Sequence, residues 1–199
     1  MLACAVALIL LIDVSGSVSP DNLALQRHGL VAALQTPEVK KTLLTQPQGM
    51  ALAVIEWSTT TRTVVPWKHI VTPQDLDYVI AILQQDPPAS GGVTAMGWAL
   101  QKALEYFHQA PCQAEVKIID VSGDGENNQG PGPQQFRDQA QEQEITINGL
   151  PIVTYLEPNI VDYYQKNVVT IDGFVIQADD FQDFSRALRR KLVMEISKR

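Results

Sequence analysis

The chain has 199 residues, of which 45% are hydrophobic, and carries 22 acidic against 15 basic side chains, for a formal net charge of −7. This length supports one sizeable core, and we expect a single domain over residues 1–199. The acidic balance argues against a nucleic-acid-binding surface, which needs clustered Lys and Arg to replace counterions on phosphate.

The first apolar run, residues 3–12, predicts a buried parallel strand. The run is too short to span a bilayer, which takes about 20 apolar residues. No lysine or arginine precedes it, as one would in a complete signal peptide. We therefore predict no membrane span, while removal of a signal peptide stays open.

A hydroxyl, a proline and an acid follow in succession at Ser19, Pro20 and Asp21 and predict a helix start. We expect this helix over residues 20–35 and a shorter one over residues 38–44.

Residues 49–57 and 61–67 predict two neighbouring strands. Their three-residue link is too short for a parallel crossover, so the pair should be antiparallel. Pro66 has no backbone donor and favours an edge position for the second strand.

The rest of the chain alternates between strands and helices, and its Pro- and Gly-rich segment 86–92 cannot be helical. The basic side chains of the last helix, Lys191 among them, should form a solvated face. This alternation predicts an α/β fold: a doubly wound, mostly parallel six-stranded sheet with one antiparallel edge strand and helices on both faces. The remaining expected strands are 116–121, 145–150 and 173–178, and the remaining expected helices are 73–85, 94–107, 131–143, a short one near 161–164, and one from 179 onward.

Five oxygen-bearing residues occur at predicted strand-to-helix loops. Asp13, Ser15 and Ser17 follow the first strand, Thr94 opens a later helix, and Asp124 lies between two glycines after another strand. In parallel sheets such loops share the carboxyl-end rim, so the five side chains can converge on one cation. Few carboxylates with several hydroxyls suit Mg²⁺ or Mn²⁺ better than Ca²⁺.

The sequence Ile-Asp-Val-Ser-Gly occurs twice, at residues 12–16 and 119–123. This repeat indicates two adjacent strands that reach one site. In this repeat Asp120 corresponds to Asp13, which makes Asp120 an alternative to Asp124 as the last ligand. We favour Asp124, since Asp120 falls within an apolar strand where it would need hydrogen-bonding partners or proximity to the ion. Asn127 and Asn128, just beyond, should shape a turn.

The two cysteines, Cys4 and Cys112, each precede an apolar run that ends in the repeated Ile-Asp-Val-Ser-Gly sequence. If the runs are adjacent strands, the sulfurs lie within bonding reach. A disulfide would indicate an oxidising compartment, and so a periplasmic or secreted protein. The alternative is a pair of small buried thiols.

The elements Asp13-x-Ser15-x-Ser17, Thr94-x-x-Gly-x-Ala-Leu and Asp124-Gly125, in this order, resemble the von Willebrand factor A domain and its metal-ion-dependent adhesion site. The family usually has Thr-Asp-Gly where this chain has Ser-Gly-Asp-Gly. Residues 119–128, 147–152, 163–164 and 190–196 also resemble an uncharacterised bacterial branch of that superfamily.

The resemblance implies a protein-binding module of the adhesion or scaffold type. Asp13, Ser15, Ser17, Thr94 and Asp124 would hold the ion, and an acidic side chain of a protein partner would complete its coordination.

Two alternatives remain: a Mg²⁺-dependent phosphoesterase and a structural domain with a degenerate metal site. A strand-end Asp with Mg²⁺ is also found in phosphatases similar to haloacid dehalogenase. Their motif has a second Asp two residues on as acid/base, where this chain has Ser15. We therefore expect a binding module and not an enzyme.

Overall fold

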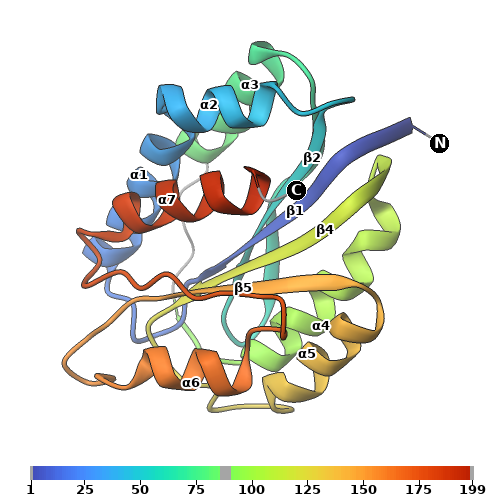
Figure 1. Ribbon diagram of the computed structural model, residues 1–199. Coiled ribbons are helices and arrows are strands. Elements are labelled where there is room, and N and C mark those ends of the chain that lie inside the picture. Colours follow the sequence, from blue (N-terminus) through green and yellow to red (C-terminus); the bar gives the residue numbers. More distant parts are fainter. Residues whose placement is uncertain (1, 86–90, 198–199) are drawn as a thin grey trace.

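The computed structural model describes residues 2–85 and 91–197. In this part of the chain one five-stranded sheet has the order β3-β2-β1-β4-β5 and is covered by helices on both faces (Figure 1). This is the predicted doubly wound α/β architecture. The strands are β1 (Leu2–Asp13), β2 (Met50–Trp57), β3 (Thr61–Ile70), β4 (Cys112–Gly123) and β5 (Ile145–Pro151).

Strand β1 pairs in parallel with both β2 and β4, and β4 pairs in parallel with β5. Strand β3 is antiparallel to β2 and lies at the sheet edge, so the predicted hairpin is confirmed. Because β1 and β4 are neighbours, the two Ile-Asp-Val-Ser-Gly sequences lie side by side, as the repeat indicated. The carboxyl ends of the four parallel strands therefore meet at one rim.

The first helix begins where its cap predicted, whereas the last helix, expected from residue 179, begins at Phe184. The Ser19 side chain accepts a hydrogen bond from the Asn22 N–H, with Pro20 in the first turn, and Thr36 caps the next helix in the same way. The predicted non-helical segment 86–92 lies mostly outside the described residues. The helices are α1 (Pro20–Gln35), α2 (Pro37–Leu44), α3 (Pro73–Gln85), α4 (Met96–Tyr106), α5 (Pro133–Glu142), α6 (Ile160–Asn167) and α7 (Phe184–Ser197), with a short 3₁₀ turn at Phe107–Gln109.

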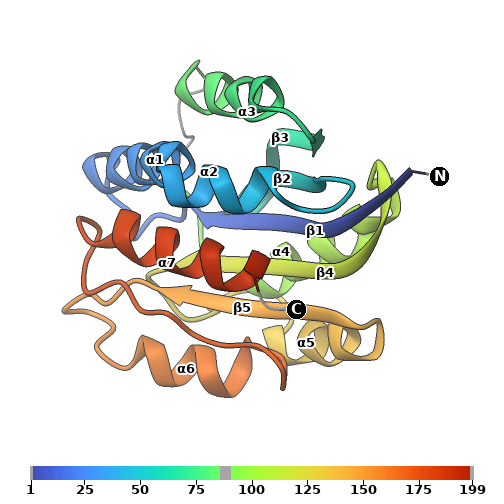
Figure 2. The ribbon, with the colours of Figure 1, turned by 45° about the horizontal axis from the view of Figure 1, so that its top comes forward.

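Alternate side chains of β1 enter two separate cores. Leu8 and Leu10 pack with buried residues of α1, α2, α3 and α7, whereas Ile9 and Leu11 pack with those of α4, α5 and α6. Figure 2 shows the two helical layers with the sheet between them. A strand buried on both faces explains why the β1 sequence is an unbroken apolar run.

The expected sixth strand is not a regular one. Residues 173–178 run beside β5 in parallel, joined to it by two isolated bridges. Backbone hydrogen bonds join the two segments, among them one from the Gly149 N–H to the Phe174 carbonyl and one from the Ile176 N–H to the Gly149 carbonyl. Where the pairing begins, side chains also take part: Thr170 Oγ1 accepts from the Ile147 N–H, and Asn148 Oδ1 accepts from the Phe174 N–H. The sheet of the described residues thus has five strands rather than six.

Cys4 and Cys112 form a disulfide, with Cα atoms 5.7 Å apart. The pair joins β1 to β4 near the start of each strand, at the opposite end from the rim. The predicted bond is confirmed. In the described residues no helix has the length and apolar character that crossing a bilayer requires.

The prediction of a solvated basic face on α7 is wrong for Lys191. Its side chain is fully buried, and its ammonium lies 2.7 Å from Asp120 Oδ1 and 2.6 Å from Glu195 Oε1. Asn148 Nδ2 also donates to Glu195 Oε1, at 2.8 Å. We call Asp120, Lys191 and Glu195 the α7 ion cluster. A helical pattern that counts every lysine as exposed cannot identify such a pairing.

Candidate metal centre

The five predicted ligands converge at the carboxyl-end rim. Asp13, Ser15 and Ser17 leave β1, Thr94 precedes α4, and Asp124 follows β4. Four of them are buried, and Ser17 is exposed at the surface. Three loops far apart in sequence thus bring their oxygen atoms to one place.

The oxygen atoms form a chain of short contacts. Ser17 Oγ donates to Asp124 Oδ1 at 2.6 Å and lies 3.1 Å from Ser15 Oγ. Thr94 Oγ1 donates to Ser15 Oγ at 3.5 Å. The Ser15 N–H donates to Asp13 Oδ1 at 2.8 Å, which fixes the carboxylate against its own loop.

These separations fit the geometry of a small hard cation. Mg²⁺ takes octahedral ligands at about 2.1 Å, so neighbouring ligand oxygens lie about 3.0 Å apart. The three contacts among the hydroxyls and Asp124 span 2.6–3.5 Å, which brackets that spacing. The oxygens are close enough to be neighbouring ligands of one ion.

Asp13 is the most constrained carboxylate of the site. Its side chain is fully buried, and its second oxygen, Oδ2, has no hydrogen-bond partner. Burial raises the pKa of Asp13 to about 7, against the lowering effect of the hydrogen bonds from Ser15, and the charge of Asp124 adds to the rise. Burial likewise raises the pKa of Asp124, opposed by its hydrogen bond from Ser17. Two desolvated carboxylates without a cationic side chain between them favour a bound cation.

Gly123 makes the space beside Asp13. A Cβ atom at this position would lie 2.7 Å from Asp13 Oδ2 and 3.0 Å from the hydroxyl of Tyr164 on α6. The Tyr164 hydroxyl is buried and, like Oδ2, has no hydrogen-bond partner. Burial and then the negative charge of Asp13 raise the pKa of Tyr164 well above its ordinary value. The extra glycine, a departure from the usual family motif, thus lets β4 pass close to the Asp13 carboxylate.

Asp120 occupies a different environment. Its Oδ1 forms the ion pair with Lys191 in the α7 ion cluster, whereas its Oδ2, like that of Asp13, has no hydrogen-bond partner. Asp124 instead contacts Ser17 at the rim. The geometry supports the preference for Asp124 over Asp120.

Asn127 and Asn128 do more than shape a turn. Asn128 Oδ1 accepts from the Thr94 N–H at 3.0 Å, and the Asn128 N–H donates to the Thr94 carbonyl at 2.9 Å. Asn127 Oδ1 accepts from the Gly97 N–H at 3.1 Å and so caps the first turn of α4. Sequence reasoning missed this role, because the partners lie about thirty residues away.

Backbone hydrogen bonds join the first two loops. The Gly16 N–H donates to the Gly92 carbonyl at 2.9 Å, and the Gly91 N–H donates to the Val14 carbonyl at 3.0 Å. Gly91 and Gly92 have φ of +120° and +88°, in the region that favours glycine. The site oxygens therefore lie on loops that are fastened to one another.

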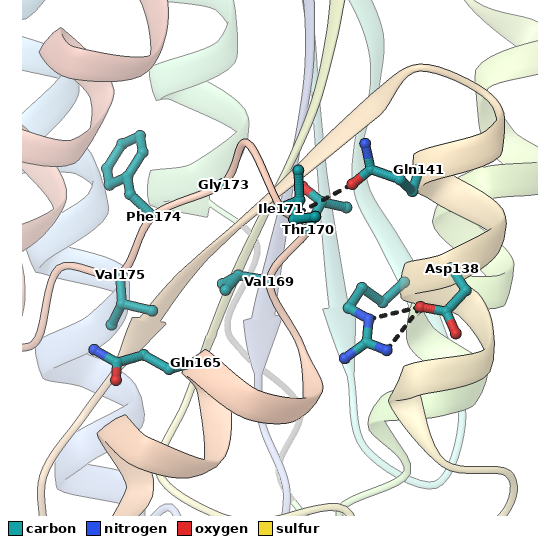
Figure 3. Close-up of a pocket in the computed structure, with 10 residues that line it drawn as sticks. Asp138, Gln141, Gln165, Val169, Thr170, Ile171, Gly173, Phe174 and Val175 are labelled. Atoms are coloured by element: carbon teal, nitrogen blue, oxygen red, sulfur yellow. Dashed lines mark hydrogen bonds and ion pairs between the residues drawn. The ribbon is translucent and has the colours of Figure 1, made fainter.

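Trp98 and a surface hollow are two further features of the described residues. The ring of Trp98, 39% exposed, lies over Gly130. A hollow of about 620 Å³ lies between α5, α6 and residues 169–175 (Figure 3). Several of its polar side chains are engaged within the protein: Arg137 pairs with Asp138, and Gln141 Oε1 accepts from the Ile171 N–H. Neither feature offers a set of converging ligands.

A profile of the family described as "Protein of unknown function (DUF1194)" matches residues 3–199. The chain belongs to this family. None of the curated proteins searched gives a significant match.

Solved structures similar to this one are von Willebrand factor A-type domains. Proximal thread matrix protein 1 from the mussel byssus has a TM-score of 0.71 at 17% identity over 98% of this chain. A von Willebrand factor type A protein from Catenulispora acidiphila has 0.66 at 22% over 98%, and the hypothetical protein BatB from Bacteroides thetaiotaomicron has 0.64 at 17% over 98%. The fold is therefore that of the von Willebrand factor A domain.

The extent of these matches differs. This chain spans 47% of the mussel protein and 43% of the Catenulispora protein, but 100% of BatB. A further structure of the mussel protein, at a TM-score of 0.69, 16% identity, 96% of this chain and 46% of that one, is described as having a zinc-occupied metal-ion-dependent adhesion motif.

Proposed function

We propose that the protein is a divalent-cation-dependent protein-binding module of the adhesion or scaffold type. Asp13, Ser15, Ser17, Thr94 and Asp124 hold the cation, directly or through water. An acidic group of a partner protein completes the coordination. When bound, the cation supplies a positive centre at the rim that attracts this carboxylate.

One observation carries the proposal. Oxygen atoms of three separate loops form a chain of contacts of 2.6–3.5 Å, beside a fully buried carboxylate whose Oδ2 has no partner. Buried charges in proteins are normally paired or ligate a metal. The likeness to a fold in which one relative has a zinc-occupied motif of this kind supports the same conclusion.

The ligand set favours Mg²⁺ or Mn²⁺ as the resident ion. All five side chains offer oxygen, which suits hard cations, whereas zinc sites in proteins rely mainly on Cys and His. Two carboxylates and three hydroxyls leave the ion room for water or a partner's oxygen, as Mg²⁺ prefers.

Calorimetric titration of the chelator-treated protein with MgCl₂ tests the metal site. The unmodified protein should bind Mg²⁺ and unfold at a higher temperature in its presence, since a ligand of the native state raises stability. Asp13→Ala should abolish both effects. Asp21→Asn, which removes an exposed acid at the start of α1, is the matched control and should leave both unchanged. Full Mg²⁺ binding by Asp13→Ala would refute the assignment.

The same proteins distinguish the two alternatives. Turnover of generic phosphoesters that disappears in Asp13→Asn would indicate a phosphoesterase. Failure of both Mg²⁺ and Mn²⁺ to change the unfolding temperature would indicate a structural domain with a degenerate site.

We further propose a periplasmic or secreted location, since the Cys4–Cys112 disulfide persists in oxidising compartments. Thiol titration of the denatured native protein should find no free thiols. Two free thiols would remove this argument.

A further inference from the structure

A surface groove of about 660 Å³ opens directly from the proposed metal site. Ser17 and Asp124 form one end of it. The rest is formed by α1, by the segment after β5 and by the segment before α7. A partner group that reaches the metal would lie in or beside this groove. The other lining residues are Asn22, Leu25, Val153, Thr154, Tyr155, Leu156, Asp179, Asp180, Phe181 and Gln182.

The groove has an unusually exposed apolar wall. Tyr155 is 90% exposed, Leu156 is 67% exposed, and Leu25 is exposed on the neighbouring helix. These are three of the eight large exposed hydrophobic side chains in the described residues. Apolar side chains that gather beside a binding site typically contact a partner.

The groove also has an acidic wall. Asp179 and Asp180 are exposed. Arg186 forms its ion pair with Asp183, and the pKa of Arg186 is raised first by Asp183 and less by the charge of Asp179. At the metal end, Glu157 lies close enough to Glu126 and Asp124 for their charges to raise its pKa, although burial is the larger cause. A purely anionic partner, such as a nucleic acid or a lipid phosphate, would be repelled here.

We propose that this groove binds a peptide segment of a partner protein with three adjacent chemical features: a carboxylate, an apolar side chain, and a lysine or arginine. The carboxylate reaches the cation, the apolar side chain packs on Tyr155 and Leu156, and the basic side chain faces Asp179 and Asp180. The inference rests on the proposed function, whose acidic ligand it places within a wider recognition pattern. The charge pattern of the two walls is what selects this occupant.

Fluorescence polarisation with a defined peptide panel tests the groove. Every peptide carries one central Asp, flanked on one side by Leu or Ser and on the other by Arg or Glu. In MgCl₂ the Leu/Asp/Arg peptide should bind about tenfold more tightly than the peptide with Glu in place of Arg, which corresponds to about 1.4 kcal/mol. Chelator should abolish binding of all peptides.

Paired variants assign each preference to its wall. The double variant Tyr155→Ser, Leu156→Ser should lose the preference for Leu over Ser, and Asp179→Asn, Asp180→Asn should lose the preference for Arg over Glu. Ile171→Ser is the matched control, since Ile171 is 89% exposed but lies outside the groove. It should retain both preferences.

The outcomes separate the two proposals. If Mg²⁺ binds by calorimetry but all peptides bind alike or not at all, the groove proposal is overturned and the metal site stands. If the Leu and Arg preferences persist in chelator, the metal-linked part of both proposals is overturned. If the wall variants keep both preferences, the groove is not the binding surface.

Discussion

The two copies of Ile-Asp-Val-Ser-Gly place carboxylates on neighbouring strands, yet the protein treats them differently. Asp120 is buried against the ammonium of Lys191, and its site carries its own cation. Asp13 is buried just as deeply, but no lysine or arginine of the described residues is among the groups that shift its pKa. Asp120 thus has its counter-charge within the described fold, whereas Asp13 does not, which is consistent with the proposed cation site at the rim.

The largest effect is expected at the α7 ion cluster. Lys191→Met removes the cation between Asp120 and Glu195, and leaves buried carboxylates without a counter-charge. Breaking a buried pair in this way costs about 3–5 kcal/mol. Chemical denaturation should show this loss, with Arg190→Met on the exposed face of α7 as a control near zero. A loss as small as that of the control would mean that the cluster is not structural.

At the rim we expect a substitution to raise stability rather than lower it. Asp13→Asn removes a buried charge that has no cationic partner among the described residues. In chelator at pH 8 the variant should therefore be at least as stable as the unmodified protein, with a gain on the order of 2 kcal/mol. Addition of MgCl₂ should then stabilise only the unmodified protein. Thermal unfolding in the two buffers measures both effects. A large loss of stability in chelator would contradict the comparison, because Asp13 would then be a structural residue like Asp120.

Most of the fold could be predicted from the sequence because its signals are local. The apolar run of β1, the cap at Ser19, and the short link of the β2–β3 hairpin each involve neighbouring residues. The sixth strand could not be predicted reliably. Where its pairing begins, the side chains of Thr170 and Asn148 accept hydrogen bonds from backbone N–H groups of the two segments, which is a tertiary effect.

The candidate site divides in the same way. Its five oxygen-bearing residues could be predicted, since each follows a recognisable strand or glycine loop and the motif order resembles a known family. The positions of Tyr164 and of Asn128, which accepts a hydrogen bond from the Thr94 N–H, could not be predicted. Both residues reach the site from elements whose placement only the folded chain determines. The pairing of Lys191 with Asp120 was missed for the same reason.

The α7 ion cluster should also make stability depend on pH. Burial raises the pKa of Glu195 to about 8, the charge of Asp120 adds to this, and Lys191 and Asn148 oppose it. The folded state therefore holds the carboxyl proton of Glu195 more tightly than the unfolded state does. This proton contributes fully to the free energy of unfolding below about pH 4.5, and its contribution is lost as the pH rises towards 8.

Glu195→Gln mimics the protonated form and should remove this decline, with a gain on the order of 1–3 kcal/mol at pH 8. Denaturation at a series of pH values measures the effect. Glu142→Gln, an exposed change on α5, is the control. An unchanged pH profile in Glu195→Gln would show that another group causes the decline.

The smallest effect on stability, and a separate effect on metal binding, is expected from Asn128→Ala. The change removes the acceptor of the Thr94 N–H and a weaker contact to Thr94 Oγ1, which should lower stability by about 1 kcal/mol. Because Thr94 would be held less firmly near Ser15, Mg²⁺ affinity should fall several-fold in calorimetry. Asn159→Ala, an exposed change whose side chain caps nothing, should do neither. If Asn128→Ala lowers stability and leaves Mg²⁺ affinity unchanged, Asn128 has only a structural role, as the α7 ion cluster does. Thr94 would then be positioned for the cation by its own loop.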